Sequence, residues 1–416
     1  MKPQTLPLSE VLKNYFDDSA VLEFEKLLNK KYFLTTGFPR HISRENKKQL
    51  AYQTPASVDF NTQINLAITF AESKLPQNRL IDFLLYLGEF SIAKGELISS
   101  LDVYDFLIHK IRKNKLFNSV VAYSVLAKAD IYSRMAEWDK SYRFIQKAKK
   151  YFIDQNDYRG SAKCENLLGT IYGDLGKLKK AISHFEKSLS FLNSKKDNGL
   201  IGMLEMNIGI LNNIQSKHEA AFIYFNRAFN KFRQLGDKRR IAELKHNFGM
   251  YYMNRGDFVA GMKEFDESIA YSIEGDYLPT IALSYSAKSF LYSQTKDFAL
   301  ADAFAEKALE ISHKLGDKLS IADIYKIKGI IEKQKGNITL AEQFLLSSIR
   351  LNQELENPLN FSEASYEMAL LCISQQKHKE AITYLENSLK GFVSLNVSIM
   401  ISKVQELIKE ERDLLK

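Results

Sequence analysis

A periodicity of 40 residues in the placement of small side chains constrains the fold of this chain more than any other feature. Small residues recur at this spacing without a slip at Gly169, Gly209, Gly249, Ser289, Gly329 and Ala369. A second series follows each of them by twelve residues, at Ala181, Ala221, Gly261, Ala301, Ala341 and Ala381. Two small-residue series in one register predict an array of helical repeats.

Each repeat has the pattern of two helices. In the repeat around Gly169, apolar and small residues recur three or four positions apart on both sides of Gly176, so each helix carries one apolar stripe. A single hairpin cannot bury both stripes and must stack on its neighbours. The small residues are expected where two helix backbones approach closely. Bulky residues are expected to fill the wider gaps between successive repeats, at Phe185, Phe225, Phe265, Leu345 and Leu385.

This pattern resembles the tetratricopeptide repeat (TPR). The family's first helix carries a large residue, Leu-Gly and Tyr, and here Leu168-Gly169 and Tyr172 match it; Ala181, Phe185 and Ser188 stand for the Ala, Phe and Ala of its second helix. The resemblance implies an all-α fold, a right-handed α-solenoid of TPR hairpins. About seven repeats are expected, which begin near residues 122, 162, 202, 242, 282, 322 and 362.

The repeats are longer than the usual TPR of about 34 residues. They resemble the lengthened repeats of LGN-type spindle-orientation scaffolds and of Rap-type peptide receptors. Three sites are expected to end one helix with Gly and to cap the next with Asp, at Leu235-Gly236-Asp237, Glu274-Gly275-Asp276 and Leu315-Gly316-Asp317.

Four parts are expected along the chain. Residues 1–60 read as an N-terminal helical segment with a Pro-containing linker, residues 61–121 as a helical cap or degenerate repeat, residues 122–396 as the TPR array and residues 397–416 as a C-terminal capping helix. A further repeat around Leu87, Gly88 and Leu101 would be in poor register. The stripe of Ile401, Val404, Leu407 and Ile408 could cap the solenoid or pair with a second copy in a homodimer.

The sequence predicts no enzyme, no cofactor and no metal site. The glycines before Lys177 resemble a phosphate-binding loop only superficially, because Ile171 and Leu178 stand where that motif needs Gly and Ser or Thr. His218-Glu219 would begin a zinc-protease motif only with His at the position of Phe222.

We expect a cytoplasmic protein with no membrane partner. The N-terminus lacks the apolar core of a signal peptide, and nowhere do eighteen apolar residues run together. Cys164 and Cys372 lie in different repeats, too far apart for a disulfide, and are expected to be small core residues.

The net charge of +8 makes nucleic acid a partner to consider. Basic residues gather near the N-terminus and again near residue 112, at Lys26, Lys30, Lys31, Arg40, Arg44, Lys47, Lys48, Lys110, Arg112, Lys113 and Lys115. Such a patch could contact phosphates or an acidic partner. Solvated helix ends commonly carry Lys, and no helix-turn-helix signature accompanies the patch, so nucleic acid is the less favoured partner.

The resemblance to TPR proteins also implies a binding surface, because the first helix of each repeat lines a concave groove in that family. Carried over by position, a site for a protein or peptide ligand is implied at Asn166, Met203, Met206, Ile210, Asn213, His246, Met250, Asn254, Phe290 and Gln294. Met adapts to irregular apolar side chains, and Asn can pair with an extended backbone. Packing inside the array is the alternative role for these residues.

Two classes of function follow. In the first, the chain is a scaffold or adaptor that holds a protein or peptide in the concave groove. In the second, it resembles the peptide-responsive regulators: the array senses a ligand, and the N-terminal segment acts on a kinase, a response regulator or DNA.

Overall fold

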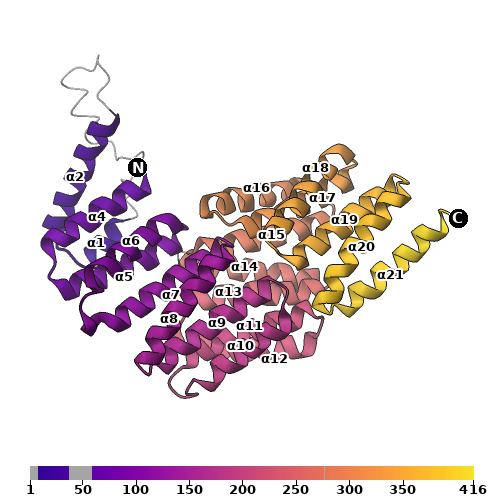
Figure 1. The fold of residues 1–416 in the computed structure, drawn as a ribbon. Coiled ribbons are helices and arrows are strands. Elements are labelled where there is room, and N and C mark those ends of the chain that lie inside the picture. Colours follow the sequence, from indigo (N-terminus) through magenta and orange to yellow (C-terminus); the bar gives the residue numbers. More distant parts are fainter. Residues whose placement is uncertain (1–7, 37–58, 276) are drawn as a thin grey trace, which may run out of the picture. The chain divides into compact units, whose positions relative to one another are not determined.

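The computed structural model describes residues 8–36, 59–275 and 277–416, and every regular element in these residues is a helix. The chain divides into two compact units, Met1–Ser124 and Val125–Lys416, which we call unit 1 and unit 2 (Figure 1). Most of the predicted linker lies outside the described residues.

Unit 1 contains α1 (Ser9–Lys13), α2 (Asp18–Thr36), α4 (Phe60–Lys74), α5 (Gln77–Ala93), α6 (Leu97–Ile111) and the 3-10 helix η1 (Lys115–Phe117). Aromatic residues fill its core, where the ring centroids of Phe24 and Phe70 lie 5.6 Å apart. In the α5/α6 hairpin a Cβ added to Gly88 would lie 2.7 Å from Cζ of Tyr104. The hydroxyl of Ser100 donates to the carbonyl oxygen of Gly88 at 2.9 Å.

The repeat array consists of helical hairpins, each with one first and one second helix; except for the first residues of α7, which belong to unit 1, it lies in unit 2. They are α7 (Asn118–Arg134) with α8 (Trp138–Asp154), α9 (Tyr158–Asp174) with α10 (Leu178–Ser190), α11 (Asn198–Ile214) with α12 (His218–Leu235), α13 (Lys238–Asn254) with α14 (Phe258–Glu274), α15 (Leu278–Gln294) with α16 (Phe298–Leu315), α17 (Lys318–Lys335) with α18 (Ile338–Glu354), and α19 (Pro358–Ser374) with α20 (His378–Leu395). The helix α21 (Ser398–Asp413) follows. The prediction of an all-α solenoid is confirmed.

The glycines of the first series pack against a bulky residue sixteen positions later in the same hairpin. A Cβ added to Gly209 would lie 2.6 Å from Cδ1 of Phe225. The same relation joins Gly169 to Phe185, Gly249 to Phe265 and Gly329 to Leu345. Phe225 also reaches the next repeat, with its ring centroid 5.5 Å from that of Phe248. The bulky residues therefore fill gaps within a hairpin as well as between hairpins.

The predicted Gly-Asp junctions hold at two of three sites. Gly236 and Gly316 end their helices with φ values of 65° and 63°, in the left-handed region that suits glycine. Asp237 then accepts the backbone N–H of Arg240 at 3.0 Å, and Asp317 accepts that of Ser320 at 3.1 Å. Gly275 differs, because its φ of −89° needs no glycine. Asp276 lies outside the described residues.

Unit 2 winds back on itself, so that hairpins far apart in sequence touch. The indole N–H of Trp138 donates to the carbonyl oxygen of Leu355 at 3.0 Å. A Cβ added to Gly176, in the α9–α10 turn, would overlap Pro358 at the start of α19. One apolar cluster accordingly joins Phe185 and Leu204 to Phe392 and Val404. The early and late hairpins thus form a common core (Figure 1).

The C-terminal helix and the cysteines belong to this packing. On α21 the side chains of Val404 and Ile408 are buried in the same apolar cluster, with Ile401 and Leu407 packed against it, so the stripe is covered within the chain. Cys164 and Cys372 are free and buried. None of the helices in the described part of the chain has the length and apolar character needed to cross a membrane.

Candidate binding cavity

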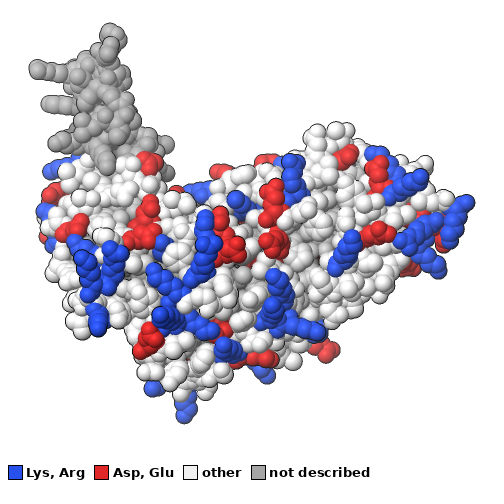
Figure 2. Space-filling model, in the orientation of Figure 1, with Lys and Arg blue, Asp and Glu red and all other residues white. Residues whose placement is uncertain are grey.

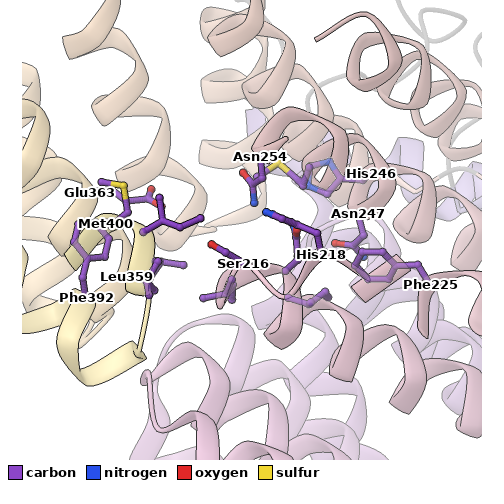
Figure 3. Close-up of a pocket in the computed structure, with 16 residues that line it drawn as sticks. Ser216, His218, Phe225, His246, Asn247, Asn254, Leu359, Glu363, Phe392 and Met400 are labelled. Carbon is purple, nitrogen blue, oxygen red and sulfur yellow. The ribbon is translucent and has the colours of Figure 1, made fainter. Parts of the chain in front are cut away.

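A cavity of about 460 Å³ lies in unit 2 between two walls that are distant in sequence. One wall is formed by α11, α12 and α13, and the other by α19, α20 and α21 (Figure 3). Successive first helices are neighbours on the inner side of the array, whereas the second wall reaches the first only because unit 2 winds back on itself.

Five of the predicted site residues line this cavity, all from the first wall: Ile210, Asn213, His246, Met250 and Asn254. Figure 3 shows His246, Asn254 and the neighbouring His218 on one side of the open space, opposite Leu359 and Met400. The structure therefore brings these predicted residues together on one inner surface.

The other predicted residues lie outside the cavity. Met206 is only 6% exposed and packs in an apolar cluster with Phe225 and Phe248, so its position on α11 turns it towards the next repeat. Asn166 is buried, and its side-chain oxygen accepts a hydrogen bond from Asn207 Nδ2 at 3.0 Å. These two side chains therefore pack between helices and are absent from the lining of the cavity.

Three further predicted residues do not reach the cavity; Met203 and Phe290 are partly buried, and Gln294 is exposed. Met203 packs against the apolar clusters on both sides of α11. Phe290 packs against α16 and α17, where Ala305 and Ile327 lie in the same cluster. Gln294 donates from Nε2 to the hydroxyl of Ser293 at 3.2 Å.

The first wall carries buried polar atoms that have no hydrogen-bond partner among the described residues. Asn213 is 7% exposed, and its Oδ1 accepts no hydrogen bond. Nδ1 of His218 is likewise buried and unpartnered. A buried polar group without a partner costs about 1–3 kcal/mol. Both atoms would gain from a ligand that supplies hydrogen bonds in the cavity.

The two histidines of the first wall are held neutral. Burial lowers the pKa of His246 to about 4, and its Nδ1 lies 3.2 Å from the hydroxyl of Ser284. Burial, helped by the charge of Arg255, also lowers the pKa of His218. Near neutral pH both rings thus offer neutral nitrogen atoms to a ligand.

The second wall is mainly apolar, with one acid. Its lining residues are Leu359, Glu363, Phe392, Val397, Ile399 and Met400. Glu363 is the charged residue of the lining and pairs with Lys326, which also lies 2.7 Å from Asp323. The sequence did not predict this second wall, because the pattern of one repeat does not show which later repeat will lie opposite to it in the fold.

The basic patch is only partly within the described residues. Lys26 is exposed on α2, and the remaining side chains of the N-terminal group are not described. In the second group Lys110 pairs with Glu72, while Arg112, Lys113 and Lys115 are exposed. Figure 2 shows basic and acidic side chains interspersed on the face that it presents, without a continuous basic stripe.

Comparisons with known proteins agree with the repeat architecture. A family model described as tetratricopeptide repeat matches residues 166–191 and 282–314. The chain is 22% identical over 184 residues to the transcriptional activator NprA of Geobacillus stearothermophilus, which covers 44% of this chain. The match spans 45% of NprA, or about half of its length.

Two solved structures share the fold. The crystal structure of a Rap protein complexed with Competence and Sporulation Factor has a TM-score of 0.58 at 13% identity and covers 96% of this chain and 99% of that chain. The crystal structure of the APC/C hetero-tetramer Cut9-Hcn1 has a TM-score of 0.55 at 15% identity and covers 89% of this chain and 63% of that chain.

The fold and the inner cavity define an α-solenoid scaffold. Its hairpins carry the TPR pattern, and two stretches of the array match the TPR family model.

Proposed function

We propose that this TPR scaffold holds an extended peptide segment in the cavity between α11–α13 and α19–α21. The observation that carries the proposal is the pair of unpartnered polar atoms on the first wall, Asn213 Oδ1 and His218 Nδ1. An extended backbone presents N–H and C=O groups at regular intervals, which is the chemistry that these atoms lack.

The apolar residues of the two walls support the same proposal. Ile210 and Met250 face Leu359, Phe392 and Met400 across the cavity. Methionine adapts its shape to irregular apolar side chains, and a cavity of a few hundred Å³ is typical of a specific ligand site. Alternate side chains of a peptide could therefore be buried against the two walls while its backbone pairs with the amides.

A second candidate function is a peptide-responsive regulator, in which the array senses the ligand and unit 1 acts on a kinase, a response regulator or DNA. The division of the chain into two compact units favours the regulator, because such a protein needs one part that senses and another that acts. The weak sequence similarity to a transcriptional activator points the same way. The likeness to the Rap protein shows the fold alone, so the choice of ligand rests on the cavity of this chain.

We assign a binding role and no catalytic role to the chain, and we place this role in the cytoplasm. The two free, buried cysteines support a reducing compartment. A protein or peptide is the proposed partner; a homodimer through α21 is not proposed, because its apolar stripe is already covered.

Affinity selection tests the proposal. The full chain is incubated with a pool of uncharged, N-acetylated octapeptides, and retained peptides are identified by mass spectrometry. We expect a defined set to be retained and Asn213→Ala to lose it, because that substitution removes a polar group of the cavity. Asn230→Ala removes the same amide from an exposed position on α12 and should retain the set. Equal retention by both variants, or no retained peptide, would reject the cavity as the binding site.

A further inference from the structure

Positive charge is concentrated on the second helices of the early hairpins. With histidine neutral, α8, α10 and α12 carry net charges of +3, +2 and +2, whereas α14 carries −3. In α8 five cationic residues stand against two acidic ones, and in α14 one stands against four. Neither α8 nor α10 contributes a residue to the lining of the cavity, so this charge lies outside the site proposed above.

The cations of α8 gather on its exposed side. They recur three or four residues apart, and therefore share one side of the helix, at Lys140, Arg143, Lys147 and Lys150. Lys140 pairs with Glu137 at 3.1 Å. The other three form no ion pair with a described residue. Three exposed charges on one helix are therefore available to an external anion.

A buried acid on α9 brings further cations of α8 and α10 together. Glu165 is 0% exposed, and its Oε1 lies 2.7 Å from Nζ of Lys149 on α8 and 3.0 Å from Nζ of Lys187 on α10. Its Oε2 lies 2.7 Å from Nδ1 of His184. Burial acts to raise the pKa of Glu165, but the hydrogen bonds from Lys149, His184 and Lys187 lower it to about 2.

The two lysines at Glu165 leave an excess of positive charge. One carboxylate balances one of the two ammonium groups, and the side chain of Lys187 is 50% exposed. The gap between α8 and α10 is thus positive as well as the exposed side of α8. We call Arg143, Lys147, Lys149 and Lys150 of α8, together with Lys187 of α10, the outer basic surface.

An exposed aromatic ring borders the outer basic surface. Tyr142 lies two helical turns before Lys149 on the same side of α8, and it is 48% exposed. Any polyanion would pair with the cations. Only a polyanion that also carries flat rings would use Tyr142, and single-stranded nucleic acid has both, because its phosphates bind Lys and Arg while its bases stack on aromatic side chains. The ring therefore favours a nucleic-acid strand over an acidic protein segment.

We propose that the outer basic surface binds single-stranded nucleic acid, with the phosphates on its cations and one base stacked on Tyr142. The site goes beyond the proposed function, since it shares no residue with the cavity. It also differs from the basic groups near the N-terminus and near residue 112. The strand is recognised by its backbone and its stacking, which are common to all base sequences.

The test measures fluorescence anisotropy of fluorescein-labelled oligothymidylate of about 20 nucleotides with the full chain, between 50 and 200 mM salt. The logarithm of the association constant should fall linearly with the logarithm of the salt concentration, by about 0.7 for each neutralised phosphate. The triple variant Arg143→Gln, Lys147→Gln, Lys150→Gln should reduce this slope by about 2 and lower the affinity at 50 mM salt about tenfold or more.

A matched triple variant controls for net charge. The substitutions Arg350→Gln, Lys379→Gln and Lys390→Gln remove one arginine and two lysines from exposed positions on α18 and α20, and this variant should bind as the wild type does. Far-UV circular dichroism and thermal unfolding confirm that both triple variants fold.

Substitutions of Tyr142 test the stacking. Tyr142→Ala should lower the affinity about fivefold or more and leave the salt dependence unchanged, because it removes a ring and no charge. Tyr142→Phe keeps the ring and should bind as the wild type does. Asn213→Ala, in the cavity, should also bind the oligonucleotide normally.

Four outcomes would overturn the proposal. The first is absence of binding at 50 mM salt, and the second is an equal loss of affinity in the two triple variants, which would show an effect of net charge alone. The third is competition by polyglutamate of equal charge as strong as that by unlabelled oligonucleotide, which would indicate an acidic protein partner. The fourth is normal binding by Tyr142→Ala together with equal affinity for a duplex of the same length.

Discussion

The ring of Phe265 lies directly on the backbone of Gly249, so a Cβ added there would be 2.6 Å from Cδ1 of the ring. The same contact between a glycine and a bulky residue recurs in the hairpins of Gly169, Gly209 and Gly329. Where the first helix carries Ser289 instead of Gly, the residue sixteen positions later is Ala305. The size of the side chain on the second helix therefore matches the space that the small residue on the first helix leaves.

Gly249→Leu should lower the free energy of unfolding of unit 2 by about 1–3 kcal/mol through overpacking. Urea unfolding followed by circular dichroism measures the change. Gly199→Ala is the control, since the atom nearest to its new Cβ would be 3.4 Å away. A second substitution, Phe265→Ala, should recover part of the loss by giving the new side chain room. No loss in Gly249→Leu would contradict the packing described.

Trp138→Phe should weaken the contact between the first hairpin and the α18–α19 turn. The substitution removes the hydrogen bond to the carbonyl oxygen of Leu355, which is worth about 0.5–1.5 kcal/mol. Differential scanning calorimetry should show a lower unfolding temperature. Tyr158→Phe removes a hydroxyl from a residue that is 62% exposed, and it should unfold as the wild type does.

Asp174→Asn should change how stability depends on pH. Burial, reinforced by the charge of Asp317, raises the pKa of Asp174 from 3.8 to about 7. The folded protein favours the protonated carboxyl of Asp174 over the ionised one. The contribution of this protonated carboxyl to the free energy of unfolding is therefore fully present below pH 3.8 and is lost as pH rises towards 7.

Urea titrations between pH 4 and pH 8 measure this effect. The variant should gain stability relative to the wild type as pH rises, with the difference levelling off above the folded pKa. Asp139→Asn, at an exposed position on α8, is the control. A pH-independent difference between Asp174→Asn and the wild type would contradict the raised pKa.

Asn213→Leu should raise the stability of the unliganded chain by about 1 kcal/mol, because it removes a buried oxygen that has no hydrogen-bond partner. Chemical unfolding of the variant and of Asn230→Leu, an exposed substitution on α12, measures the difference. The same Asn213→Leu variant should lose peptide binding. A decrease in stability would show that the amide is satisfied in the free protein.

The repeat could be predicted from the sequence because its determinants are local. Gly169 and Phe185 lie in one hairpin, and their spacing recurs in every repeat that keeps a small and a large residue there. The α5/α6 hairpin keeps the same spacing between Gly88 and Tyr104 but precedes the next repeat by 41 residues instead of 40, which explains its poor register.

The cavity could be predicted only in part. Asn213, Met250 and Asn254 lie on adjacent first helices, so the pattern of a single repeat is enough to orient them. Leu359 and Met400 face them because small rotations between successive hairpins accumulate over several repeats. No residue within a single repeat determines this total rotation. The pKa of Asp174 is raised by burial and then by the charge of Asp317, which belongs to a distant turn, so the second of these causes depends on the same winding.

The contact between Gly176 and Pro358 gives the array a defined length. An open solenoid can gain or lose a repeat at little cost, because each hairpin touches only its neighbours. Here a deletion of 40 residues between these two positions would move Pro358 away from Gly176 and separate the two walls of the cavity. Recombination between repeats, which readily changes the length of other solenoids, would therefore take apart the cavity of this one.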